Sequence, residues 1–455
     1  MMLHGLYVTP ENEAFSTDLY QLTMAAAYWT HRMNEESTFE LYFRRLPKNR
    51  SFVLATGLEQ VLHYIQNLHF TNDQIEWLRS QPQFHNVDLG FFQYLKNFRF
   101  SGDIYAVPEG TPVFPLEPML QVRARLIEAQ ILETHVLALL NMQSLIATKA
   151  ARIVHAARGR SVIDFGTRRA HGPQAGLLAA RASYVGGCKG TSNVLAGQLA
   201  NIPIYGTAAH SFTMAFAHEI DAFRAYFKVF PDSTILLIDT YDTVAAAKKV
   251  KDVASNVKGV RIDSGDLVDL TRKVRSILDQ DGLMHVKIFV SGDLNEYKIY
   301  DLLAANAPID FFGVGTELVT SYDDPALSGV YKLVEATTEG KLHSRIKTSH
   351  SKLSYPGKKQ IYRFLQGSYY SHDMMCLFDE QAPTGGIPLL ECYCKNGKVV
   401  EILPGISEIQ NRAQFELHRL SHEFHDLIQA VDYPVGLSDK LLEELSRLQK
   451  EFRAE

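Results

Sequence analysis

The feature that most constrains the fold is a repeating pattern in the middle third of the chain. Short apolar or β-branched runs end in small or acidic residues, and a helix-length segment follows each run. These runs are residues 161–166, 183–187, 202–207, 234–239, 259–264, 287–292 and 310–315. Their starts lie about 19 to 32 residues apart, the span of one strand-plus-helix unit. Seven such units in series predict parallel strands joined by right-handed crossovers.

Two α/β architectures satisfy this pattern. Polar residues follow almost every predicted strand at its carboxyl end, where the active sites of α/β barrels are built. A doubly wound sheet, the alternative, would gather such residues at one switch point. The distribution therefore favours an irregular, seven-stranded α/β barrel.

The two ends of the chain read differently from the middle. Residues 14–33 have the apolar spacing of a capped helix, and residues 38–43 alternate like a half-buried strand. Residues 102–125 suggest irregular antiparallel strands, strand-like patterns return after residue 329, and the tail from residue 406 is mostly helical. We therefore expect an outer α+β domain formed by residues 1–125 and 366–455, with the barrel at residues 126–365.

Composition narrows the function classes. The chain has 455 residues, with 46 Lys plus Arg against 51 Asp plus Glu, a formal net charge of −5. It lacks the global cation excess of a generic nucleic-acid binder. No apolar run approaches the roughly 20 residues of a membrane helix, and no secretory pattern opens the chain. We expect a cytoplasmic enzyme without nucleic-acid or membrane partners.

Several short motifs fail on their spacing. Residues 186–191 resemble a phosphate loop, but the lysine precedes the glycine. His422 and His425 lie one position too close for the two-histidine zinc helix. Cys376, Cys392 and Cys394, with His372 nearby, match no standard zinc spacing and do not make a disulfide framework. The sequence assigns these cysteines no role.

The polar residues at the predicted strand ends form a stronger pattern. Taken singly, each is as well explained by a turn or a helix cap. Glycine-rich strand ends that lead into helices offer backbone N–H groups to phosphate. Neighbouring carboxylates suit Mg²⁺, and arginine suits a carboxylate or phosphate. The residues are Asp164, Arg168, Arg169, Thr207, His210, Asp239, Asp242, Arg261, Asp263, Asp266, Ser291, Gly292, Asp293, Gly313, Gly315 and Thr316. Together they predict a Mg²⁺-assisted enzyme acting on a phosphorylated, anionic small molecule.

Eight blocks in order along the chain also resemble nicotinate phosphoribosyltransferase, in a superfamily that includes the nicotinamide and quinolinate enzymes. They are residues 17–24 (TDLYQLTM), 164–170 (DFGTRRA), 191–197 (TSNVLAG), 206–212 (GTAAHSF), 238–242 (IDTYD), 261–266 (RIDSGD), 313–316 (GVGT) and 356–360 (PGKKQ). The family fold, an irregular α/β barrel beside a domain built from both termini, agrees with the organisation expected above.

The resemblance implies an activity and a set of roles. Family members join nicotinic acid to 5-phosphoribosyl 1-diphosphate, with coupled ATP hydrolysis, and are classed as ligases although the chemistry is glycosyl transfer. It implies that His210 is transiently phosphorylated by ATP. Asp239 and Asp263 would face the ribose hydroxyls and the Mg²⁺-diphosphate, so either is a possible Mg²⁺ ligand. The implied phosphate contacts are Arg168, Gly292, Gly315 and Thr316.

For the nicotinate ring, the resemblance implies a sandwich between Phe165 and Tyr20, the latter supplied by the partner subunit of a homodimer with shared sites. Arg261 and Thr207 would contact the carboxylate. Nicotinamide-using relatives carry an aspartate where this chain has Ser192. A serine can donate to a carboxylate that an aspartate would repel, which favours the acid over the amide.

Three alternatives remain at this stage. The chain could be a nicotinamide phosphoribosyltransferase, or a barrel enzyme acting on a different phosphosugar. It could also be a catalytically inactive relative with a binding role, although His210, Arg261 and Asp263 are all present.

Overall fold

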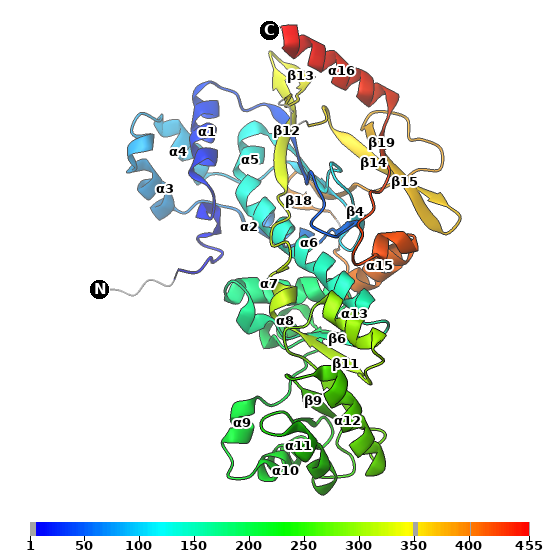
Figure 1. Ribbon diagram of the computed structural model, residues 1–455. Helices are drawn as coiled ribbons and strands as arrows, with labels where there is room; N and C mark the ends of the chain where they lie inside the picture. The colour runs from blue at the N-terminus through cyan, green and yellow to red at the C-terminus, as the bar shows by residue number, and fades with distance from the viewer. Residues whose placement is uncertain (1–5, 349–353, 401, 455) are drawn as a thin grey trace.

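The computed structural model describes residues 6–348, 354–400 and 402–454 and shows two halves joined by one long helix (Figure 1). One half holds a parallel sheet formed by the middle of the chain. The other half holds largely antiparallel sheets to which both ends of the chain contribute, and we call it the antiparallel half. Among the described residues, no helix is both long enough and apolar enough to cross a membrane.

The parallel sheet contains six strands in the order β7-β6-β11-β10-β9-β8. Every neighbouring pair is parallel, as the repeating strand-plus-helix pattern predicts. The strands are β6 (Ser161–Asp164), β7 (Gly190–Thr191), β8 (Ile235–Leu237), β9 (Gly259–Ile262), β10 (Lys287–Val290) and β11 (Phe311–Val314). The helices of this half are α7 (Pro173–Val185), α8 (Val194–Ala200), α9 (His210–Met214), α10 (Glu219–Val229), α11 (Thr243–Lys249), α12 (Leu267–Gln280), α13 (Glu296–Ala304) and α14 (Thr316–Val319), with short 3-10 turns at Thr167–Arg169 and Val250–Asp252.

Two of the seven expected strands differ from the sequence prediction. The strand expected at residues 183–187 is wrong, because α7 continues to Val185 and Gly187 then turns with a φ of +106°. The alanine- and leucine-rich run before it favours a helix, and the strand forms later, at β7. The expected strand at residues 202–207 is reduced to an isolated parallel bridge between Thr191 and Ile204. In the described part of the chain, no strand pairing connects β8 to this bridge, so closure into a barrel stays a prediction.

Largely antiparallel sheets fill the other half. The largest has the order β13-β12-β1-β5-β3-β17-β18, and β2 pairs with β4. A second sheet has the order β16-β14-β15-β19, in which only the β15–β19 pair is parallel. The strands are β1 (Glu36–Tyr42), β2 (Val53–Leu54), β3 (Asp103–Ala106), β4 (Pro112–Val113), β5 (Leu120–Arg125), β12 (Val330–Thr338), β13 (Lys341–Ser344), β14 (Lys359–Gln366), β15 (Tyr369–Leu377), β16 (Ile387–Pro388), β17 (Glu391–Lys395), β18 (Lys398–Val399) and β19 (Val435–Leu437).

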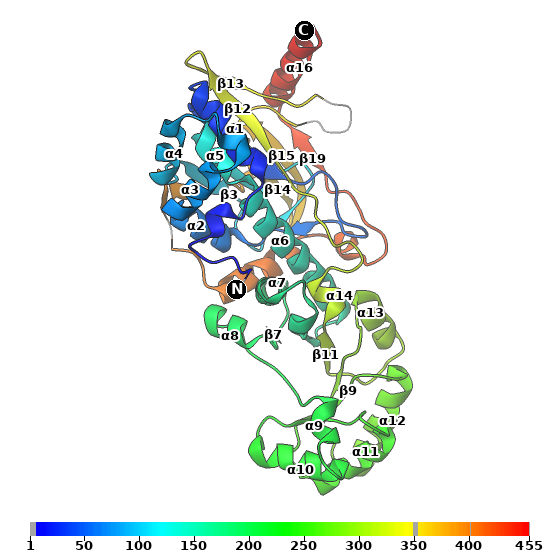
Figure 2. The same ribbon diagram turned by 90° about the vertical axis from the view of Figure 1, so that its left-hand side faces the viewer.

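Helices cover these sheets. They are α1 (Leu19–Thr30), α2 (Leu58–Asn67), α3 (Asn72–Arg79), α4 (Leu89–Lys96), α5 (Leu126–Ile131), α15 (Ile406–His418) and α16 (Asp439–Ala454), with 3-10 turns at Glu13–Phe15, Pro82–Phe84 and His422–His425. Figure 2 shows α1 to α5 on one side of the sheet and α16 at its far end. Strands β12 to β14 share sheets with the two termini, which supports a division near residue 329. A boundary at residue 365 would separate β14 from its partner β15.

The long helix α6 (Glu133–Ala156) runs from the antiparallel half into the parallel half, where it packs against α7 and α13. Its fully buried Lys149 places Nζ 2.6 Å from an oxygen of Glu296 on α13 and 2.8 Å from an oxygen of Asp323. Arg152, one turn further on, bonds Glu296 at 3.1 Å, and Arg50 bonds Asp323 at 3.1 Å. This buried charge cluster joins α6 to a loop of each half.

Replacing Lys149 with alanine should therefore destabilise the whole chain. Removal of one partner from a buried ion pair leaves the other charge poorly compensated and costs about 3 kcal/mol or more. Lys251→Ala is the matched control, because its pair with Asp281 is half exposed and screened by solvent. Urea unfolding followed by circular dichroism should show a lower midpoint for Lys149→Ala only. Equal midpoints for the two variants would contradict this role.

Candidate active site

The guanidinium of Arg261 is the centre of a hydrogen-bonded network at the carboxyl ends of the parallel strands. Arg261 lies on β9 and is 9% exposed. Its Nε donates to Ser291 Oγ at 2.8 Å, Nη1 to Thr207 Oγ1 at 2.7 Å and Nη2 to Asp263 Oδ1 at 2.7 Å. Three of its five N–H groups are used, so one remains on each terminal nitrogen. Among the described residues these two N–H groups have no partner, and arginine can bind a carboxylate through one N–H from each terminal nitrogen.

Asp263, the residue after β9, is held as an anion. Partial burial acts to raise its pKa, but hydrogen bonds from Ser291 and Arg261 and the nearby His210 outweigh that effect. The pKa of Asp263 therefore lies below its ordinary value. One carboxylate oxygen accepts from both Ser291 and Arg261, which leaves Oδ2 facing His210.

Asp239 is the second carboxylate at the carboxyl ends of the parallel strands, a region that we call the rim. It follows β8, and its Oδ2 accepts from the backbone N–H of Asp263 at 2.9 Å and from Ser264 Oγ at 2.8 Å. Its Oδ1 is buried and has no hydrogen-bond partner among the described residues. A buried, unsatisfied carboxylate oxygen costs free energy unless a cation or a donor joins it. The position therefore suits a bound cation.

His210 begins α9, a short helix at the same rim, and its side chain is 39% exposed. Its Nδ1 lies 3.2 Å from Thr240 Oγ1. Its Nε2 lies 3.9 Å from Asp239 Oδ1 and 3.9 Å from Asp263 Oδ2. An imidazole with one nitrogen tied to a hydroxyl and the other between two carboxylates is oriented for nucleophilic or acid–base chemistry.

An aromatic surface adjoins the arginine. The Arg261 Cζ lies 5.4 Å from the centre of the Phe165 ring, and Phe289 packs against that ring with centroids 5.4 Å apart. Gly313 makes room for this packing, because a Cβ there would lie 2.7 Å from a Phe165 ring carbon. Phe165 thus presents a ring beside a cationic fork, an arrangement suited to a flat aromatic carboxylate.

The loop with Ser192 is fixed by a buried acid. Asp164, the last residue of β6, accepts from the Gly166 N–H at 2.8 Å and from Thr191 Oγ1 at 2.6 Å. Burial raises the pKa of Asp164, although both hydrogen bonds counteract it. The N–H of Ser192 donates to the Asp164 carbonyl at 2.8 Å. The backbone at Ser192 is therefore fixed next to β6, the strand that leads into Phe165.

The predicted phosphate contacts lie at strand ends of the same sheet. Gly292 follows β10 with a φ of +101°, and a Cβ there would lie 2.0 Å from the Asp263 carbonyl oxygen, so only glycine fits. Gly315 directly follows β11, and Thr316 is the first residue of α14. Arg168, after β6, is exposed, and its guanidinium has no partner among the residues that the structure describes.

Tyr20 is not brought to this rim. It lies on α1 and is 46% exposed, and both views place α1 beside the antiparallel sheet, apart from β9 and α9 (Figures 1 and 2). Within one chain, Tyr20 and Phe165 therefore do not form a sandwich.

Two residues that the structure connects to the network had no individual role in the sequence analysis: Ser291 was named only among the polar strand-end residues, and Thr240 was not singled out. Ser291 bridges Arg261 and Asp263, and Thr240 holds His210 Nδ1. Both directly neighbour predicted site residues at strand ends, which is the signal that could have identified them.

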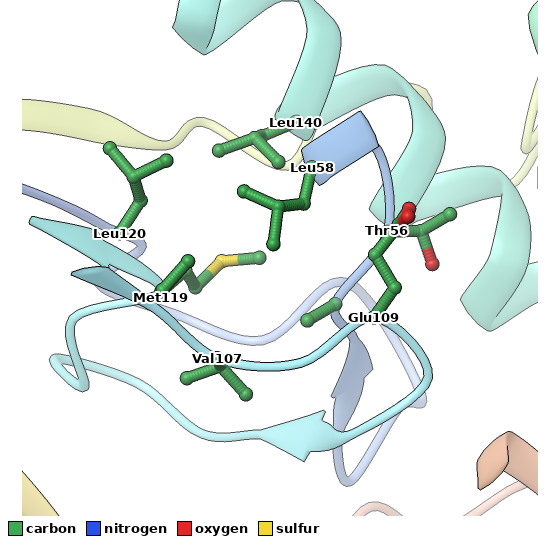
Figure 3. A pocket seen from close by; sticks show the side chains of 9 residues that line it. Thr56, Leu58, Val107, Glu109, Met119, Leu120 and Leu140 are labelled. Carbon is green, nitrogen blue, oxygen red and sulfur yellow. The ribbon is translucent and has the colours of Figure 1, made fainter. Parts of the chain in front are cut away.

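A small pocket and the late cysteines do not fit a substrate or a metal ion. Figure 3 shows the side chains that line the pocket, Glu109 among them. The volume of this pocket is about 10 Å³, which is room for about one water molecule. In the described ranges, no group of three or more histidine, cysteine or acidic side chains is arranged to hold a metal ion, and the four cysteines are free thiols. The zinc site considered for the late cysteines thus finds no support.

The fold and the Arg261 network define an α/β enzyme whose rim suits a phosphorylated, anionic substrate. Comparison with known proteins gives the family. Residues 15–141, 160–381 and 386–445 match the N-terminal domain, the family model and the C-terminal domain of nicotinate phosphoribosyltransferase. The chain belongs to the nicotinate phosphoribosyltransferase family.

Similar proteins cover almost the whole chain. A nicotinate phosphoribosyltransferase of Mycobacterium tuberculosis is 43% identical over 450 residues, which covers 97% of this chain and 95% of the relative. One of Bacillus subtilis is 38% identical over 480 residues, covering 96% and 97%. The crystal structure of the human nicotinic acid phosphoribosyltransferase matches with a TM-score of 0.83 and 30% identity, covering 95% of this chain and 99% of that one.

Proposed function

We propose that this chain transfers 5-phosphoribose from 5-phosphoribosyl 1-diphosphate to nicotinic acid, giving nicotinate mononucleotide and diphosphate in NAD salvage. The observation that carries the proposal is the free fork of Arg261 beside the Phe165 ring. Family membership and the 43% identical relative support the same activity. Four free thiols fit a reducing, cytoplasmic location.

The chain's own residues account for binding of the base. The two unused N–H groups of Arg261 would hold the nicotinate carboxylate in a bidentate pair, while Thr207 and Ser291 keep the guanidinium in place. Phe165 would stack on one face of the pyridine ring, and the Ser192 hydroxyl would add a donor. This orientation directs the ring nitrogen toward the ribose carbon that loses diphosphate.

Two carboxylates suit the ribose and Mg²⁺. The unsatisfied Oδ1 of Asp239 and the outward Oδ2 of Asp263 are hard oxygen ligands, and Mg²⁺ typically takes one or two carboxylates together with substrate phosphates. Bound there, Mg²⁺ would neutralise charge on the leaving diphosphate. Gly292, Gly315 and Thr316 would offer backbone N–H groups to phosphate, and Arg168 a free guanidinium.

His210 is the proposed acceptor of a phosphoryl group from ATP. It is accessible, and Thr240 fixes its orientation. Formation of the N-glycosidic bond does not itself need a phosphohistidine. A phosphoryl group would add about −1.5 to −2 charges beside Arg261, Asp239 and Asp263, by analogy with other phosphorylated side chains. We propose that this charge favours a state with high affinity for the diphosphate substrate.

The shared site of a homodimer is the remaining part of the proposal. Tyr20 is half exposed on α1 and distant from Phe165 within its own chain. In a dimer it would complete the partner's aromatic sandwich.

Substrate choice gives the first test. Wild-type kcat/KM should favour nicotinic acid over nicotinamide by about 10⁴-fold, because the amide leaves the Arg261 fork unpaired. Ser192→Asp should lower kcat/KM for nicotinic acid by about 100-fold or more through charge repulsion. Ser192→Ala is the matched control and should lose only a few-fold. Comparable wild-type rates with both bases would overturn the assignment of the acid.

His210→Ala separates energy coupling from glycosyl transfer. The variant should lose ATP hydrolysis and ATP stimulation while still forming nucleotide slowly at high concentrations of the diphosphate substrate. Phosphohistidine detection after incubation with γ-labelled ATP checks the wild type. ATP hydrolysis that continues in step with product would rule out His210 as the acceptor. A folded variant that forms no product at any concentration would place His210 in the glycosyl transfer itself.

Subunit mixing tests the shared site. Tyr20→Ala and Arg261→Ala should each be nearly inactive alone, but a mixed dimer contains one site with both residues intact. Activity should therefore rise when the two proteins exchange subunits, as followed by tagged co-purification. No recovery despite proven exchange would show that Tyr20 serves only its own subunit.

A further inference from the structure

A large cleft lies between α6, α13 and the segment formed by α15 and the turn His422–His425. Figure 1 shows these helices on one flank of the molecule. The volume of the cleft is about 1100 Å³, enough for a ligand with several rings or groups. Residues of α6 and of the segment that follows it line the cleft as far as Gly159, just before β6 begins, so the cleft adjoins the amino end of that strand. The rim residues lie at the carboxyl ends, and none of them lines this cleft.

The cleft contains one arginine, Arg158, whose guanidinium makes no hydrogen bond or ion pair with the described residues. Arg152 is committed to Glu296 and to the carbonyls of Asp426 and Leu427. Arg158 is exposed, has a φ of +48°, and places Cζ 4.8 Å from the Tyr300 ring. Arg158 is therefore available to an anionic ligand.

Flat rings stand beside this cation. The imidazoles of His155 and His425 stack with centroids 5.1 Å apart and planes 19° apart. Tyr297 and Tyr300 line the wall formed by α13. Burial, followed by mutual repulsion with neighbouring cations, lowers the pKa of His155, and burial lowers that of His425. Near neutral pH these rings are uncharged surfaces on which an aromatic base can stack.

The two acidic residues that line the cleft differ in their hydrogen-bond partners. The Asp426 carboxylate accepts the backbone N–H groups of Ile428 and Gln429, both at 2.7 Å, and so serves its own turn. Asp301 follows Tyr300 on α13, and its carboxylate has no partner in the described part of the chain. A free carboxylate is an acceptor for hydroxyl donors such as those of a ribose.

We propose that this cleft is a second ligand site, which binds a nucleoside 5′-phosphate. Arg158 contacts the phosphate, the tyrosine and histidine rings stack on the base, and Asp301 accepts from the ribose hydroxyls. The site is separate from the rim and does not depend on the function proposed for it.

Binding should strengthen as pH falls. In the protein without ligand, the pKa values of His155 and His425 lie below the ordinary value for histidine. A bound phosphate stabilises the protonated imidazoles and therefore raises both pKa values. The charged and titratable groups that line the cleft with this pair are Arg152 on α6, Arg158 just after α6, His418 on α15, His422 and Asp426 beyond α15, and Asp301 on α13. Protonation of these two histidines adds positive charge next to the bound phosphate, and this sets the direction.

Photolabelling of the full-length protein tests the proposal. With 8-azido-AMP, mass spectrometry should find label on peptides containing residues 151–158, 297–301 or 414–428, with more label at pH 6 than at pH 8. Arg158→Asn, which suits the positive φ, should reduce this label about tenfold. Arg79→Asn removes an exposed arginine on α3 and is the matched control that should keep it.

Competition identifies the chemistry. Unlabelled AMP should protect these peptides at concentrations where adenosine and inorganic phosphate do not. Equal protection by adenosine would show that the phosphate is not recognised, and equal protection by phosphate would reduce the site to one for a simple anion. Either of these two results would overturn the proposal. It would also be overturned if the label were confined to peptides of the rim, or if Arg158→Asn left the label unchanged.

Discussion

The pairing of Lys149 with Glu296 and Asp323 is the interaction on which the two halves of this protein depend. A lysine without any exposed surface needs compensating carboxylates, and here they come from α13 and from the loop after α14. Arg50 brings a loop of the antiparallel half to the same Asp323. The position of α6 relative to both sheets is therefore set by charge as well as by apolar packing.

Charged side chains at the rim also hold one another in position through hydrogen bonds. Arg261, Asp263 and Asp239 belong to the ends of adjacent strands, and each satisfies part of its neighbour's hydrogen-bonding capacity. What the network leaves unsatisfied is specific: two N–H groups on an arginine, one buried oxygen on Asp239 and one outward oxygen on Asp263. A substrate with a carboxylate and a metal-bound diphosphate would supply the missing partners, so geometry and family membership lead to one proposal.

Much of this arrangement could be predicted from the sequence, because strand ends are marked by the change from apolar to polar residues. This change predicts five of the strand positions. It also predicts that four polar residues cluster at the strand ends, namely Arg261, Asp263, Asp239 and His210. The error at residues 183–187 arose because β-branched and glycine residues also end helices, as Val185 and Gly186 do for α7. Ser291 appeared among the polar strand-end residues, but neither its partners nor the role of Thr240 could be predicted, since serine and threonine are common in turns.

The pairing of β1 with both β5 and β12 has a consequence for synthesis on the ribosome. The β5 partner of β1 is synthesised fewer than a hundred residues after β1. The β12 partner follows roughly 290 residues after β1, and synthesis of that length takes roughly 15 to 60 s at typical translation rates. Throughout that interval the nascent chain presents an open strand edge, a template for unwanted pairing. The antiparallel half, although it begins first, is completed only after the parallel half has emerged, so this protein matures from its middle outward.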